Sequence, residues 1–183
     1  MKRYSIKAGQ RNFRPAESWW PVFNPKGFEI EFEIEPGGWA SLEEWGNDRD
    51  WDDKMKVRGL TAYFGPNNSR SAMIAFSYGT APETWEISGY TNYPGSDIQR
   101  DGESLIIRSG TRCKAKAEFH RNKVLYLIEY EGKRVEVEHR FVRKLRVARQ
   151  VGTYPGGTNN APGPHGGRAF KDMSMLIDFK VIK

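Results

Sequence analysis

The chain has 183 residues, of which 38% are hydrophobic, 28% charged and 13% aromatic, and its formal net charge is +6. This length favours a single domain over residues 1–183 with one hydrophobic core. No apolar run follows the basic N-terminus or approaches the length of a membrane helix, so we expect no signal peptide, no membrane insertion and synthesis in the cytoplasm. A single cysteine, Cys113, excludes an internal disulfide and a cysteine-built metal site, and its apolar neighbours predict that it is buried.

An alternating segment opens the series of predicted strands. Residues 28–35, with the sequence FEIEFEIE, place apolar side chains on one face and carboxylates on the other, which is typical of a half-buried strand. Residues 36–38, Pro-Gly-Gly, end this strand. The segment 39–53 lacks this period, and we predict a long loop that carries tryptophans and several acids.

Further strands follow, separated by turns rich in Gly, Pro and Asn. They are predicted at 59–64, 71–78, 84–90, 104–107, 113–119, 124–130, 134–138 and 173–181. Residues 141–151 fit either a strand or a basic helix, and we favour the strand; residues 154–167 are predicted to form a second long loop. About ten short strands without a long helix predict an all-β sandwich or barrel.

Charge is unevenly spread along the chain. Residues 29–53 hold ten acids against one base, whereas residues 108–149 hold thirteen bases against five acids. This distribution predicts two oppositely charged faces. The alternative is a basic surface for nucleic acid or acidic polysaccharide.

Five short segments carry a resemblance to a known family. They are 6–10 (IKAGQ), 50–54 (DWDDK), 68–70 (NSR), 85–90 (WEISGY) and 156–162 (GGTNNAP). In order and spacing, over residues 4–182, they are similar to small concanavalin-like β-sandwich proteins of phages and bacteria, most of which have no assigned activity. The resemblance implies a concanavalin-like jelly-roll β-sandwich, a fold that also serves legume-type lectins, glucanases and several polysaccharide lyases.

The two long loops combine aromatic rings with amides, which are the side chains that proteins use against sugar C–H faces and hydroxyls. The alternative for each ring is that it fills the core of the sandwich. The candidate ligand-binding residues are Trp39, Trp45 and Trp51 in the first loop, Tyr154, Asn159, Asn160 and His165 in the second, and Arg70 and Tyr90 at strand ends.

The acidic loop is also a weak candidate for a calcium site. Asp48, Asp50 and Asp52 carry oxygens of the kind that Ca²⁺ prefers. The sixth and twelfth positions counted from Asp48 are Asp53 and Gly59, however, and an EF-hand loop requires Gly and Glu there. We therefore favour an acidic loop without metal, and we expect no other cofactor.

These features predict a non-enzymatic surface-recognition module that binds a glycan or cell-surface polysaccharide. The resemblance adds a role as an accessory or decoration protein of a phage virion, with virion proteins as partners. The alternatives are a small polysaccharide lyase or glycoside hydrolase of jelly-roll fold, and a purely structural virion protein. His120 and His139 lie near predicted turns and are expected at the surface, and no nucleic-acid-binding signature is present.

Overall fold

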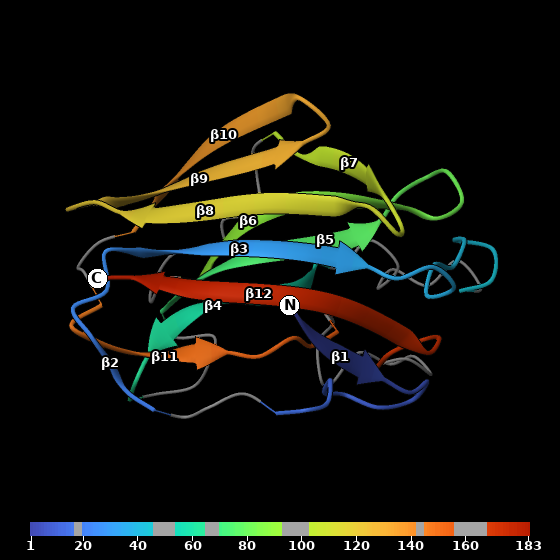
Figure 1. Cartoon of the computed structure of the whole chain (residues 1–183), viewed down its shortest axis with the longest axis horizontal. Coiled ribbons are helices and arrows are strands. Elements are labelled where there is room, and N and C mark those ends of the chain that lie inside the picture. Colours follow the sequence, from blue (N-terminus) through green and yellow to red (C-terminus); the bar gives the residue numbers. More distant parts are fainter. Residues whose placement is uncertain (17–19, 46–53, 65–69, 93–102, 142–144, 156–167) are drawn as a thin grey trace.

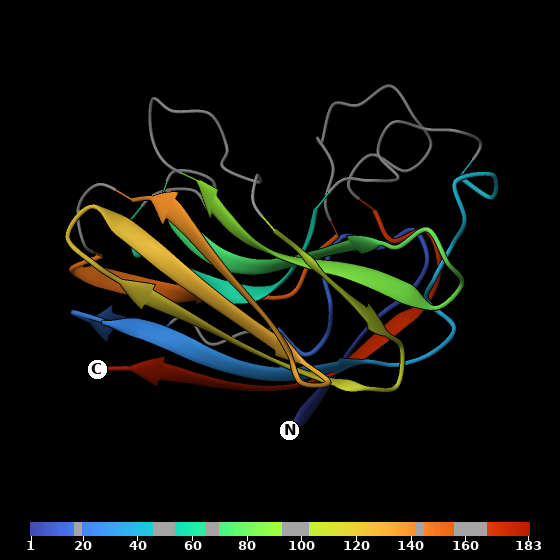
Figure 2. The same cartoon turned by 90° about the horizontal axis from the view of Figure 1, so that it is seen from above.

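A computed structural model describes residues 1–16, 20–45, 54–64, 70–92, 103–141, 145–155 and 168–183. These residues form two antiparallel sheets that pack face to face, as the two layers of Figure 2 show. The described part of the chain contains no helix, and hence none long and apolar enough to span a membrane. The prediction of an all-β sandwich is confirmed.

Each sheet has six strands, and Figure 1 shows sheet A in front of sheet B. Sheet A contains, in spatial order, β1 (Lys2–Ile6), β12 (Met173–Ile182), β3 (Gly27–Ile34), β8 (Arg112–Phe119), β9 (Lys123–Tyr130) and β10 (Lys133–Arg140). Sheet B contains β2 (Val22–Phe23), β11 (Val147–Val151), β4 (Met55–Ala62), β5 (Ser71–Tyr78), β6 (Thr84–Asn92) and β7 (Leu105–Arg108). The chain therefore changes sheets several times, and the first and last strands pair with each other.

The alternation in the sequence fixes which side chains enter the core. Phe28, Ile30, Phe32 and Ile34 of β3 are all at most 3% exposed, because every second side chain of the strand faces sheet B. Cys113, opposite Phe32 on β8, is fully buried as predicted, and burial raises the pKa of its thiol to about 12. The predicted meander of β8, β9 and β10 is also confirmed.

Strand β4 begins at Met55, four residues before the predicted start. Its register shifts between Lys56 and Arg58, and this β-bulge interrupts the alternation on which the sequence prediction relied. Arg58 consequently lies between the sheets at 6% exposure, where its guanidinium donates to the Tyr4 hydroxyl at 2.9 Å and to Oε1 of Gln150 at 2.6 Å. Desolvation lowers the pKa of Arg58, while Tyr4 raises it in part.

The expectation that His139 lies at the surface is wrong. His139 belongs to β10 and is 2% exposed, because it continues the inward row formed by Val135 and Val137. Its Nδ1 lies 3.0 Å from the hydroxyl of Thr91, which in turn lies 2.8 Å from the hydroxyl of Tyr126. This buried network links β10, β6 and β9 across the sandwich.

The prediction of two oppositely charged faces is also wrong for the described residues. The acidic strand β3 and the basic strand β8 are neighbours in sheet A, so their charged side chains lie on the same outer face. Lys116 lies opposite Glu29 in the register and 3.9 Å from its carboxylate, and Arg112 lies 3.4 Å from Glu31. The acidic and basic segments thus compensate each other across the strands.

The packing at Gly89 provides a test of the sandwich. A Cβ atom at this position would lie 2.5 Å from Cδ2 of the buried Tyr126 ring. We expect Gly89→Ala to lower the free energy of unfolding by about 1–3 kcal/mol or more, since the core cannot accept the added volume without strain. Urea denaturation followed by tryptophan fluorescence measures the change. Ile106→Ala, at a side chain that is 52% exposed on the neighbouring strand β7, is the control and should change stability little.

Candidate binding site

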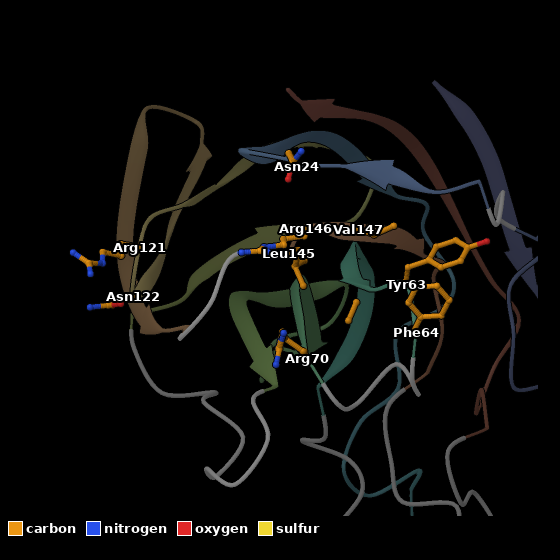
Figure 3. Close-up of a pocket in the computed structure, with 10 residues that line it drawn as sticks. Asn24, Tyr63, Phe64, Arg70, Arg121, Asn122, Leu145, Arg146 and Val147 are labelled. Carbon is orange, nitrogen blue, oxygen red and sulfur yellow. The ribbon is translucent and has the colours of Figure 1, made fainter.

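An open pocket of about 950 Å³ lies at one end of the sandwich, where several strands begin or end (Figure 3). Tyr63 and Phe64 follow β4, Arg70 precedes β5, and Arg146 precedes β11. Asn24, which follows β2, lines it as well. The pocket is thus assembled from segments that are far apart in the sequence.

Backbone hydrogen bonds fix these segments relative to one another. The Tyr63 amide donates to the Val147 carbonyl at 3.0 Å, and the Asn24 amide donates to the Arg146 carbonyl at 2.8 Å. The Arg70 carbonyl accepts from the Ala62 amide at 2.9 Å and from the hydroxyl of Thr61 at 3.0 Å. The frame of the pocket is therefore built into sheet B.

Two aromatic rings form one wall of the pocket. Tyr63 and Phe64 meet edge to face, with ring centroids 5.1 Å apart and an interplanar angle of 84°. Phe64 is 80% exposed, whereas Tyr63 is partly buried. Such a pair offers an apolar surface to a ligand, and the Tyr63 hydroxyl points away from the arginines in Figure 3.

Arginines provide the charge of the pocket. In Figure 3, Arg70 and Arg146 lie between the two rings and the β8–β9 turn, from which Arg121 and Asn122 project at the far rim. No aspartate or glutamate is among the described residues that line the pocket. Guanidinium groups and amides are planar hydrogen-bonding groups suited to carboxylates, sulfates and sugar hydroxyls.

The outer face of sheet B holds a second polar cluster, separate from the residues that line the pocket. Nζ of Lys54 lies 3.0 Å from the carboxylate of Glu86 and 3.2 Å from the hydroxyl of Ser77. Burial alone would raise the pKa of Glu86, but the hydrogen bond and the charge of Lys54, together with Ser104 and Ser77, hold it below the ordinary value of 4.5. Glu86 is thus maintained as a carboxylate.

Two of the predicted site residues meet beside this cluster. The ammonium of Lys56 lies 4.3 Å from the centroid of the Tyr90 ring and 5.4 Å from that of Tyr154. Lys56 and Tyr90 are each 5% exposed. Because the ring of Tyr90 is covered by Lys56, it offers no free face to a sugar in this structure. The cation–π contacts hold Lys56, Tyr90 and Tyr154 together.

The tryptophans of the first predicted loop take other places. Trp45 is 7% exposed and packs on Phe170, with centroids 5.0 Å apart and planes 25° apart, and edge-on against Tyr78. Trp39 is partly buried against the core, and its indole N–H donates to the Gly79 carbonyl at 3.0 Å. Trp45 therefore packs in the core, which was the alternative to sugar binding, and neither tryptophan lines the pocket.

The remaining candidates cannot be placed. They are Trp51, Asn159, Asn160 and His165, together with the calcium candidates Asp48, Asp50 and Asp52, and all lie outside the described residues. Within the described ranges, no group of three or more His, Cys, Asp or Glu side chains is arranged to hold a metal ion. Of the candidates that the structure describes, Arg70 lies in the pocket, and Tyr90 and Tyr154 lie together at Lys56.

Sequence reasoning missed the aromatic wall. The strand predicted at residues 59–64 includes Tyr63 and Phe64, and neither residue is among the predicted ligand-binding residues. One signal was present, because neighbouring residues in an extended chain point to opposite sides, so both rings could not enter one core. No local signal linked them to Arg146, which lies on a segment joined to β4 only by sheet pairing.

Comparisons with known proteins identify the fold. No family model matches the sequence, and no curated protein matches it either. Among solved structures, an alginate lyase from Klebsiella pneumoniae superimposes with a TM-score of 0.50 and 7% identity, over 85% of this chain and 60% of that one. The chain therefore spans less than two thirds of the length of this neighbour.

Two glucanases are further structural neighbours. SCLam, an endo-β-1,3(4)-glucanase of family GH16, gives a TM-score of 0.48 at 10% identity, over 87% of this chain and 57% of that one. The catalytic domain of an endo-1,3-β-glucanase (laminarinase) from Thermotoga petrophila gives 0.47 at 10% identity, over 98% and 75%. The chain has the concanavalin-like jelly-roll fold. Similarity at identities this low leaves the activity open.

The Lys54–Glu86 pair predicts a dependence of stability on pH. A carboxyl whose pKa is lowered by folding contributes stability above its unfolded pKa, and this contribution is lost as the pH falls through the folded pKa. We expect Glu86→Gln to lower the urea midpoint near neutral pH and to change it much less well below pH 4.5, the ordinary pKa. Equal losses at both pH values would contradict this assignment. Glu103→Gln, at an exposed residue before β7, is the control.

Proposed function

We propose that this protein binds carbohydrate through the pocket at the end of the sandwich, as a recognition module without catalytic activity. The observation that carries the proposal is the combination of an aromatic pair, of which Phe64 is 80% exposed, with planar polar side chains around one open pocket. Sugars present C–H faces that pack on aromatic rings and hydroxyls that accept or donate hydrogen bonds in defined directions. Tyr63 and Phe64 supply the first kind of contact, and Asn24 supplies the second.

The size and rigidity of the pocket agree with this proposal. Its volume of about 950 Å³ leaves room for more than one sugar ring. The backbone hydrogen bonds from Tyr63 to Val147 and from Asn24 to Arg146 hold the lining in place before a ligand arrives. Preorganisation of this kind lowers the entropy that binding would otherwise lose.

Binding is favoured over hydrolysis at this pocket. Glycoside hydrolysis uses a pair of carboxyl groups that flank the bond to be broken. The described lining holds arginines, amides and aromatic rings, and no carboxylate is among them.

The second candidate function is that of a polysaccharide lyase. β-Elimination from a uronic acid needs a base and cationic groups that neutralise the sugar carboxylate. Tyr63, Arg70 and Arg146 line the same pocket, so these residue types are present together, but the Tyr63 hydroxyl points away from the two arginines in Figure 3. Turnover would be detected by the ultraviolet absorbance of the unsaturated uronate that such elimination forms, and by the release of reducing ends from a polysaccharide panel. We expect no turnover.

The biological setting that we propose is a phage particle, on the strength of the resemblance in the sequence. The protein would be made in the host cytoplasm and would act on the virion as an accessory or decoration protein. Co-purification with particles, combined with binding to host polysaccharide, would support this role. Co-purification without any saccharide binding would favour a purely structural virion protein instead.

The aromatic wall gives the direct test of carbohydrate binding. We expect Phe64→Ala and Tyr63→Ala each to weaken saccharide binding by about tenfold, since each removes a stacking surface worth on the order of 1 kcal/mol or more. A glycan array would find the ligand, and isothermal titration calorimetry would measure the loss. Ile106→Ala removes an apolar side chain that is 52% exposed on β7, outside the pocket, and should bind like the unmodified protein. Unchanged affinity in both aromatic variants would exclude this pocket as the site.

A further inference from the structure

Several basic side chains on the outer face of sheet A are paired with acids, and these pairs give a comparison for the arginines of the pocket. On the outer face of sheet A, Lys116 lies 2.7 Å from Glu118, and Arg112 lies 3.4 Å from Glu31. On β10, the exposed Arg134 lies 3.1 Å from Glu136. Many basic side chains there are thus neutralised by neighbouring acids.

The pocket arginines differ from these. Within the described ranges, Arg70, Arg121 and Arg146 form no ion pair with an acid, although all three line one pocket. Like charges that gather without acids raise the local positive potential, and a recessed site focuses that potential on a ligand. This arrangement favours a negatively charged ligand over a neutral one.

Arg70 adds a more specific observation. Its Nε is buried, and no hydrogen-bond acceptor for it exists among the residues that the structure describes. A buried donor left without an acceptor is destabilising, and buried donors in folded proteins are almost always paired. The neighbouring carbonyl of Arg70 is fully engaged with Thr61 and Ala62, so the backbone around this donor is already fixed. A bound oxyanion would supply the missing acceptor.

We propose that the pocket takes an anionic saccharide, whose carboxylate or sulfate pairs with Arg70 and Arg146 while its ring packs against Tyr63 and Phe64. This inference rests on the proposed function of the same pocket and names the class of ligand. Planar guanidinium groups bind such oxyanions through two parallel hydrogen bonds. The carboxylate and the sulfate share this chemistry, and an experiment separates them.

The alternative polyanion, a nucleic acid, fits less well. Nucleic-acid-binding surfaces carry basic side chains along an extended stripe that follows the phosphate backbone. Here the basic strand β8 is paired with the acidic strand β3, and the unpaired arginines surround a single pocket. A compact cluster of this kind suits one charged sugar or a short segment of a chain.

The test measures the affinity of the full chain for four probes by titration calorimetry. The probes are a uronate oligomer, the same oligomer with its carboxyl groups reduced to alcohols, a sulfated oligosaccharide and single-stranded DNA. We expect binding to the uronate or the sulfated probe that is at least about tenfold tighter than to the reduced oligomer, because charge-assisted hydrogen bonds are the stronger kind. The anionic probe that binds more tightly identifies the source of the charge. Added salt should weaken this binding and leave binding to the reduced oligomer nearly unchanged.

Three variants at two arginines locate the effect in the pocket. Arg70→Gln and Arg146→Gln should each weaken binding of the anionic probe by about tenfold or more, and Arg70→Lys should restore little of it, since lysine lacks the planar fork. Arg134→Gln, at an exposed arginine of β10 outside the pocket, is the matched control and should bind normally. Circular dichroism confirms that each variant folds, and Arg146 is exposed enough that its replacement should not disturb the fold.

The outcomes separate this inference from the proposed function. Equal affinity for the charged and the reduced oligomers would overturn the anionic inference and leave carbohydrate binding intact. Binding to DNA in preference to every saccharide would overturn both. No binding to any saccharide on a broad array would remove the proposed function, and the anionic inference with it. Loss of anion binding in Arg134→Gln as well as in the pocket variants would show that net charge, and not the pocket, governs affinity.

Discussion

The pairing of β11 with β4 is the constraint on which the pocket depends. Through it, the Val147 carbonyl accepts a hydrogen bond from the Tyr63 amide, and β11 is brought beside β4 although the two strands are far apart in the sequence. The same sheet continues to β2, where the Asn24 amide reaches the Arg146 carbonyl. Because backbone groups at a strand end must find partners, these bonds also fix the directions of the side chains that surround the pocket.

The distribution of charge gives the pocket its chemical character. A protein with a net charge of +6 could carry its excess anywhere on its surface. The order of strands in sheet A places β3 beside β8, so that acids and bases there neutralise each other across the ladder. Arg70 and Arg146 lie at strand ends in sheet B, away from that ladder, and no acid neutralises their charge within the described residues. The topology of the fold thus decides where a basic protein is locally basic.

Some aromatic rings of the chain pack against other side chains, whereas others are exposed and can contact a ligand. Trp45, Tyr78 and Phe170 pack together in the interior, and the ring of Tyr90 is covered by Lys56. Phe64 remains 80% exposed. From composition alone all of these rings are equivalent, since stacking on a sugar and packing in a core use the same apolar surface. Burial distinguishes them, and burial depends on the whole fold.

The sequence by itself determined the all-β class, the central strand at Phe28–Ile34 and the meander of β8 to β10, because the period-2 pattern is a local property of each strand. It placed Arg70 among the candidate residues, yet it placed His139 at the surface and missed the entry of Arg58 between the sheets. The tertiary structure decided these points. A β-bulge breaks the local pattern at Arg58, and the neighbours of a strand end are chosen by pairing between distant segments, which no local period records. Pairing between distant segments also brings Tyr63, Arg70 and Arg146 together around one pocket.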